Sequence, residues 1–279
     1  MKYSNLFNEI RFDIKQGIIA RAGWFLMAVL VSVVFAEVFF FTRNQMITDG
    51  RVSGELYYMD AYMWMFRGME KYNPQAKEAF DITDSYLVWN FLLAFIIGDY
   101  PVRELRTTGK NWLVRSESRT AWWFGKCIWN IITVFLFYIC IHIGIVITAF
   151  VNNASWEPSL NQDVFVRTFK SVIDWNYADI LMCKALLLPI LSSLAVSQLQ
   201  MLLMLILGAI TGYAGVVVSS GVSAFYMTGV LPGNGMMVWR YKCITPEGIG
   251  ILSPIVADMV IVILCVIVGY KIFKKYDIL

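Results

Sequence analysis

The stretch LMCKALLLPILSSLAVSQLQMLLMLILGAITGYAGVVVSSGVSAFYMTGVL, residues 181–231, decides the fold. It contains only one charged residue, Lys184. A helix of about 20 residues crosses a hydrocarbon layer of ~30 Å, so this run is too long for a single span. The glycines of GAITGYAG, residues 208–215, weaken a helix and favour a tight turn. We therefore predict two membrane spans here, at 181–207 and 213–231.

Apolar blocks of similar length recur along the rest of the chain. The 279 residues are 58% apolar and 15% aromatic, with a mean hydropathy of +0.62, whereas about 45–50% apolar residues is typical of soluble domains. Ser253 and Pro254 supply an N-cap and a first-turn proline for the last block. The blocks predict four further spans, at residues 22–41, 83–98, 127–151 and 254–273.

The N-terminal residues 3–20 place apolar side chains at helical spacing, from Tyr3 to Ile18. Such a helix is too polar to span, so we expect it to lie in the membrane interface. An ordinary cytoplasmic helix that packs on a partner is the alternative.

Basic residues indicate the orientation. They are about twice as dense in the predicted loop 99–126 and at the chain ends as in the predicted outer segments, which are residues 42–82, 152–180 and 232–253. The positive-inside rule therefore places loop 99–126 and both termini in the cytoplasm. The sequence thus predicts a single-domain, all-α integral membrane protein with six transmembrane helices in the cell membrane, preceded by an amphipathic interfacial helix.

The predicted outer segments carry two further expectations. The aromatic stretch YYMDAYMWMF, residues 57–66, is expected to rest on the outer leaflet. Cys183 and Cys243 both fall near the outer face, where a disulfide remains an alternative to two free thiols. The spacing of the five cysteines and the single histidine does not indicate a metal site.

Polar residues within the predicted spans are the candidates for a substrate path. Glu37 and Asp258 lie near outer ends, where interfacial anchoring is the alternative. Asn90, Gln198 and Gln200 lie deeper, where hydrogen bonding between helices is the alternative. The sequence contains no nucleotide-binding loop, HExxH motif or GxSxG motif, so we expect neither an enzyme nor a bound cofactor.

The loop DYPVRELRTTGKNWLVRSESRTAWWFGK, residues 99–126, combines six basic residues with the apolar trio at 112–114. It is suited either to anionic lipid heads or to a cytoplasmic partner. Its last part, SRTAWWFGK at 118–126, resembles the SR-x5-GK signature that precedes the third span of type-2 ABC exporter permeases. The predicted layout of the whole chain is similar to that family as well.

This resemblance implies a permease subunit that pairs with a separate ATP-binding cassette subunit and with a second permease copy, giving twelve spans. ATP and Mg²⁺ would then bind to the partner subunit, not to this chain, and no nucleic acid is expected. In the family the first inner loop docks on the ATP-binding subunit. The implied contact residues are Arg106, Lys110, Trp112, Leu113, Val114, Arg115, Ser116, Glu117, Ser118 and Arg119.

The cargo and the competing functions follow from the same residues. A path lined by Phe, Met, Trp and Val side chains suits an amphipathic or hydrophobic cargo, and the layout is similar to exporters of amphipathic peptide toxins such as phenol-soluble modulins. A stand-alone channel or secondary transporter is the alternative, as is a membrane sensor or immunity protein that transports nothing.

Overall fold

The computed structural model describes residues 3–76, 79–106 and 119–275. These residues form a helical bundle, and no β-strand occurs among them. The helices in chain order are α1 (Tyr3–Asp13), α2 (Ala22–Thr48), α3 (Tyr58–Met65), α4 (Asp84–Ile97), α5 (Tyr100–Arg106), α7 (Arg119–Val151), α8 (Gln162–Phe169), α9 (Ala178–Leu207), α10 (Ala209–Phe225) and α11 (Leu252–Lys275). A π-helical turn (Ile14–Ile18) and a 3-10 turn (Ile19–Arg21) join α1 to α2.

Five helical stretches are long and apolar enough to cross a membrane, namely residues 6–48, 84–105, 119–151, 175–207 and 252–275. Helix α10 is apolar but shorter, with 17 residues, or about 26 Å at 1.5 Å per residue. Stretches of this length and composition are typical of membrane spans. The protein is therefore an all-α membrane protein.

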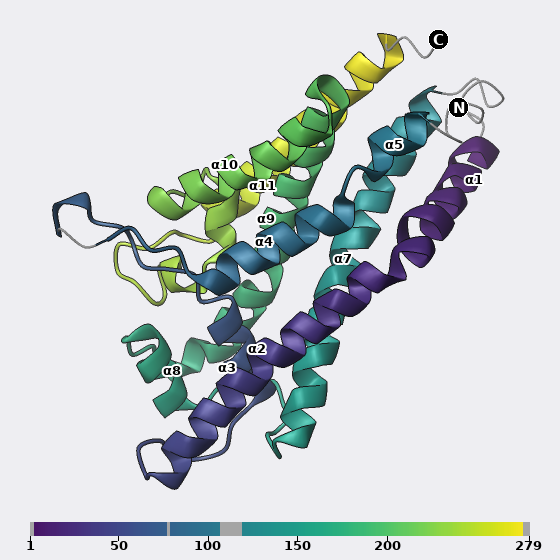
Figure 1. The fold of residues 1–279 in the computed structure, drawn as a ribbon. Helices are drawn as coiled ribbons and strands as arrows, with labels where there is room; N and C mark the ends of the chain where they lie inside the picture. Colours follow the sequence, from purple (N-terminus) through teal and green to yellow (C-terminus); the bar gives the residue numbers. More distant parts are fainter. Residues whose placement is uncertain (1–2, 77–78, 107–118, 276–279) are drawn as a thin grey trace.

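The two ends of the bundle differ in character. Helix α1 begins and α11 stops at one end, which we call the terminal end (Figure 1). Helices α3 and α8 lie at the opposite end, which we call the loop end (Figure 1). Residues 66–67 accept hydrogen bonds there from the backbone N–H groups of Val238 and Trp239, both at 2.9 Å. Three segments that are far apart in the sequence thus form one folded layer at the loop end.

Two turns at the terminal end lie close to where the sequence places them. Helix α9 stops at Leu207, and Gly208 takes a positive φ of 98° that favours glycine. Because this one residue makes the turn, α10 begins at Ala209 and ends at Phe225, which corrects the predicted limits of 213–231.

The break after α4 lies at Gly98, with φ +55°, where the predicted span 83–98 ends. Pro101 is the second residue of α5, where its missing N–H costs no helical hydrogen bond. The Arg21 guanidinium closes the end of α4 by donating to the carbonyls of Ile96 (3.0 Å) and Ile97 (3.1 Å). A cation at this position complements the negative end of the helix dipole.

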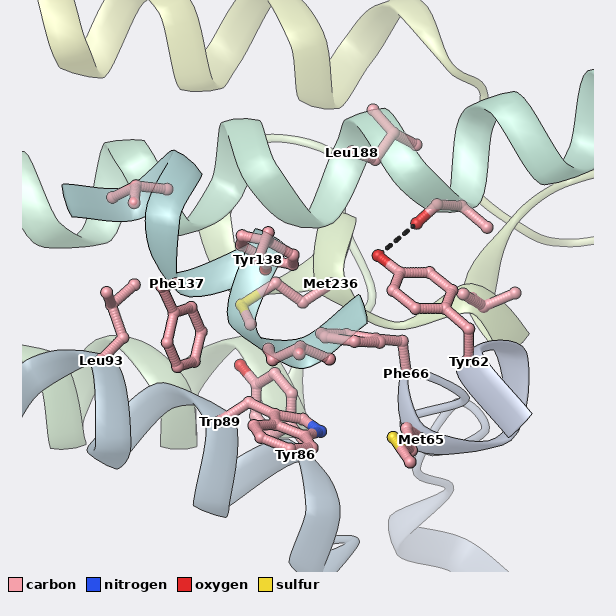
Figure 2. Packing of buried hydrophobic residues seen from close by; sticks show 14 of the residues in the cluster. Tyr62, Met65, Phe66, Tyr86, Trp89, Leu93, Phe137, Tyr138, Leu188 and Met236 are labelled. Atoms are coloured by element: carbon pink, nitrogen blue, oxygen red, sulfur yellow. Dashed lines mark hydrogen bonds between the residues drawn. The ribbon is translucent and has the colours of Figure 1, made fainter. Parts of the chain in front are cut away.

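The aromatic stretch 57–66 is not on a membrane surface, so the prediction for it is wrong. Helix α3 is inserted into the protein, and Met59, Tyr62 and Phe66 are at most 2% exposed. Tyr62 donates from its hydroxyl to the carbonyl of Ala185 at 3.2 Å, and Phe66 stacks on Trp89 with ring centroids 5.9 Å apart (Figure 2). Aromatic rings bury a large apolar area, and here neighbouring helices supply the apolar surroundings instead of lipid.

Asp60 anchors α3 at its first turn. Its two carboxylate oxygens accept the backbone N–H groups of Tyr57 and Asn161, both at 2.9 Å. Burial raises the pKa of Asp60 to about 7, because desolvation outweighs the opposing effects of these hydrogen bonds and of Arg43. The carboxyl group therefore titrates near neutral pH within the loop end.

This pKa makes the stability of the loop end depend on pH. The folded state retains the Asp60 proton between the unfolded value near 4 and the folded value near 7, so stability falls as pH rises through this window and levels off above it. The slope approaches ~1.4 kcal/mol per pH unit for one proton. Hydrogen exchange of residues 57–66 at pH 5 and pH 8, corrected for intrinsic rates, measures this dependence of stability on pH. Asp60→Asn is expected to remove the slope, and an identical slope in that variant contradicts the assignment.

Candidate functional site

The first two turns of α7, Arg119 to Lys126, contact helices from both termini of the chain. They follow residues 107–118 directly, and they contain residues 119–126 of the string SRTAWWFGK, which resembles the permease signature. Helix α1 packs along one side of α7 and α11 along another. We call this segment with its contacts on α1, α5 and α11 the α7 junction.

Lys126 is the ionic centre of the α7 junction, and its side chain is fully buried. Its Nζ forms ion pairs with Asp13 and Glu104, and with Glu9 at 3.3 Å. The Tyr100 hydroxyl also donates to Asp13 at 2.7 Å. One ammonium group thus holds carboxylates from α1 and α5 against α7.

Aromatic rings enclose this charge. The Lys126 Nζ lies 5.1 Å from the ring centroid of Tyr100 and 5.0 Å from that of Trp122. The Trp122 indole N–H also donates to Glu104 at 3.4 Å. Aromatic faces attract a desolvated cation, so the rings stabilise the charged lysine while excluding water.

Two glycines allow α1 to approach α7 this closely. A Cβ atom at Gly125 would lie 2.7 Å from the Glu9 Cγ, and one at Gly17 would lie 2.4 Å from the Trp129 Nε1. No side chain fits at either distance. The adjacent glycine and lysine of the signature-like string therefore have distinct structural roles, since the glycine admits α1 and the lysine binds it.

Helix α11 is fixed to the other side of the α7 junction. Arg119 donates to the Lys274 carbonyl at 2.8 Å, in the last turn of α11. The Trp123 indole N–H donates to the Val266 carbonyl at 2.9 Å, and its ring occupies the space that a side chain at Gly269 would need. These two bonds fix the position of α11 relative to α7. The Arg119 charge also complements the negative C-terminal end of the α11 dipole.

The carboxylates of the junction form an acidic cluster that itself would suit a cation. Ligand atoms from Glu9, Asp13 and Glu104 lie within 4.8 Å of one another. The Lys126 ammonium already pairs with all three groups. Removing one partner from a buried ion pair costs about 3–5 kcal/mol, because the remaining charge is left uncompensated. The chemistry of the cluster is thus to hold helices together at one defined position.

The structure describes only part of the predicted ATPase contact. Arg106 is the last residue of α5, and Arg119 opens α7 and bonds to α11. The other predicted contacts lie outside the described residues, namely Lys110, Trp112, Leu113, Val114, Arg115, Ser116, Glu117 and Ser118. Helix α5 ends shortly before these residues and α7 begins directly after them.

No hydrogen bond joins any two of the five candidate path residues in the part of the chain that the structure describes. Gln198 accepts from Asn130 (3.0 Å), and Gln200 donates to the Ala94 carbonyl (3.0 Å). Asn90 donates within its own helix to the Tyr86 carbonyl (2.8 Å).

The two acidic candidates also bond to neighbouring helices. Glu37 is exposed on α2 and accepts from Asn152 of α7 at 2.9 Å. Asp258 of α11 is buried and accepts from Ser192 of α9 at 2.7 Å. Interfacial anchoring was the alternative for Glu37 and Asp258, but Asp258 is buried between α11 and α9. Hydrogen bonding between helices was the alternative for the deeper residues, and Gln198 and Gln200 form such bonds.

The structure also places the single histidine and the two cysteines predicted near the outer face. His142 stacks on Tyr62 with ring centroids 4.7 Å apart. Cys183 and Cys243 are both free thiols. The disulfide alternative is therefore not realised.

Sequence reasoning missed Glu9, Asp13, Tyr100 and Glu104 as partners of Lys126. Glu9 and Asp13 lie off the apolar stripe by which the N-terminal helix was expected to contact lipid. Their spacing of four residues places both on one helix face, and that face is buried on α7 while Phe7 is 68% exposed. The sequence did contain one signal for this ion cluster, namely an acidic pair on one face of the N-terminal helix and a single lysine directly before the predicted span 127–151.

Comparison with known proteins reveals a family but no characterised relative. No curated protein and no solved structure matches the chain. A family model matches residues 25–279, which include all but the first three residues of α2 and every described α-helix after it. The chain therefore belongs to the family described as "Protein of unknown function (DUF2705)".

Proposed function

We propose that this protein is the permease subunit of an ATP-driven exporter. In this proposal α10 crosses the membrane together with the five longer helices, giving six spans with both termini in the cytoplasm. Two copies form a twelve-span transporter. A separate ATP-binding cassette subunit supplies the ATP and Mg²⁺ chemistry and docks on residues 106–119.

The α7 junction is the observation that carries this proposal. Residues 107–118 lead into Arg119, and within eight residues α7 is tied to α11 through Arg119 and to α1 and α5 through Lys126. A partner that moves this segment therefore acts on several helices at once. Packed helices respond to such a force by switching between discrete arrangements, which is what transport requires.

The apolar surface of α2 supports an amphipathic or hydrophobic cargo, a peptide above all. Its side chains at positions 27, 34, 38 and 41 are Met, Val, Val and Phe, and they are 46–62% exposed. They point away from the described bundle, which leaves them for lipid, a second copy or cargo. Flexible and aromatic side chains of this kind adapt to varied apolar surfaces.

Copurification tests the docking. The chain is coexpressed with the ATP-binding cassette subunit of the proposed exporter, and Lys110→Glu with Arg115→Glu is expected to reduce recovery of that subunit at least tenfold, because charge reversal opposes a complementary surface. Arg119 is left unchanged, since its bond to α11 would confound the result. Lys15→Glu with Lys271→Glu, at two exposed basic residues, is the matched control. Unchanged recovery with intact membrane insertion rejects the proposed docking.

A further inference from the structure

A small pocket of about 240 Å³ lies between α2, the end of α3 and the N-terminus of α4. Its apolar side is formed by Phe35 and Trp64, whose ring centroids are 6.3 Å apart. Its polar side is formed by Arg67, Asp81, Asp84 and Ser85. The pocket is at the loop end, next to α2, whose apolar surface supports the proposed cargo.

The wall of the pocket is preformed. Thr83 donates to the Gly68 carbonyl at 2.8 Å, which ties the start of α4 to the chain after α3. The Arg67 guanidinium lies over the Trp64 ring, 5.4 Å from its centroid. Neither Asp81 nor Asp84 forms an ion pair within 4 Å with any residue that the structure describes.

Ser85 gives a second, independent indication of a ligand. It lines the pocket and is 5% exposed, yet its hydroxyl has no hydrogen-bond partner among the described residues. A buried hydroxyl without a partner costs free energy, and a ligand in this pocket is positioned to satisfy it.

The size and charge of the pocket select the ligand. Whole small-molecule sites occupy about 300–1,000 Å³, so 240 Å³ holds a side-chain-sized part of something larger. Two carboxylates against one guanidinium leave an excess negative charge that favours a cation. The aromatic side favours an apolar group next to that cation.

We propose that this pocket binds one basic side chain of an amphipathic peptide, with its neighbouring apolar side chain against Phe35 and Trp64. The inference rests on the proposed export of such a peptide and places a cargo contact at the loop end of α2 and α4. Asp81 and Asp84 hold the ammonium group, and the Ser85 hydroxyl accepts from it or from the peptide backbone.

Photo-crosslinking on the full chain in neutral maltoside detergent tests the site. The probe is an 18-residue Leu/Lys amphipathic helix with a benzophenone side chain, and its saturation gives an apparent Kd. Asp81→Asn with Asp84→Asn is expected to raise that Kd roughly three- to tenfold, as exposed ion pairs contribute modestly. Glu157→Gln with Asp179→Asn removes two exposed acidic groups elsewhere and is expected to leave the Kd unchanged.

The outcomes separate this inference from the proposed function. Adducts on residues 64–67 or 81–85, and weak competition by the matching Leu/Glu peptide, support the site. An equal Kd in both double variants, or adducts confined to other segments, rejects it even when the ATP-binding subunit copurifies. Failure to copurify that subunit rejects the proposed exporter, whereas pocket-dependent crosslinking would still establish a peptide site.

Discussion

Lys126→Met is expected to destabilise the protein by about 3–5 kcal/mol, the cost of leaving buried charges without their partner. The substitution keeps most of the side-chain volume but removes the cation that pairs with Glu9, Asp13 and Glu104. Three carboxylates would then face one another at the α7 junction. A thermal unfolding series in detergent, followed by size-exclusion fluorescence, measures the loss.

Two comparisons make the result specific to the ion cluster. Lys271→Met removes an exposed lysine from α11 and is expected to change stability by less than ~0.5 kcal/mol, the usual range for surface substitutions. Combining Lys126→Met with Glu9→Gln, Asp13→Asn and Glu104→Gln is expected to restore at least half of the loss, because no unpaired charge remains. A Lys126→Met variant as stable as the Lys271→Met control would contradict the role assigned to the cluster.

Arg240→Leu is expected to have the second large effect, at least ~3 kcal/mol, by leaving several buried carbonyls unsatisfied. The Arg240 side chain is fully buried at the loop end and donates to the carbonyls of Ser223 and Ala224, in the last turn of α10. It also donates to the Met69 carbonyl at 3.1 Å and to the Glu70 carbonyl at 3.3 Å. Burial lowers the pKa of Arg240 to about 10, so the guanidinium is still charged at neutral pH.

Arg240→Lys separates the charge from the geometry. Lysine retains the positive charge but cannot present the planar fork of five N–H donors, so we expect about half of the Arg240→Leu loss. Lys242→Leu, at an exposed position two residues away, is the matched control. Limited proteolysis of residues 66–73 and 226–250, together with thermal unfolding, is the measurement. Full stability of Arg240→Lys would show that charge alone holds this layer.

The two buried cations, Arg240 and Lys126, lie at opposite ends of the bundle and have different surroundings. Arg240 is surrounded by backbone carbonyls, which do not change charge, and it fixes the loop end to α10. Lys126 is surrounded by carboxylates from two other helices, at the end where the proposed ATP-binding subunit docks.

Much of the helical plan was predictable from local chemistry. The run 181–231 was expected to divide near its glycines, and Gly208 makes the turn with a positive φ. The first predicted span was expected to begin at Ala22, where α2 begins. Such features depend on length, hydropathy and glycine geometry, all of which are local.

The buried site was not predictable in the same way. Glu9, Asp13 and Glu104 read as solvated charges, since nothing near them in the sequence offers a cation at the right distance. Their partner is 113 residues away from Asp13 along the chain. The prediction for the aromatic stretch 57–66 was wrong for a related reason. Lipid and a protein interior are both apolar, so a sequence pattern alone does not distinguish burial in one from burial in the other.

The sequence by itself determined that this chain is helical, resides in a membrane and turns at particular glycines, because hydrophobic length and backbone geometry act over short distances. Only the tertiary structure decided which charges are buried, which helix inserts between others and where Lys126 and Arg240 find their partners. The free energy of a buried charge depends on the atoms that packing brings within a few ångströms of it, and that proximity exists only in the folded protein.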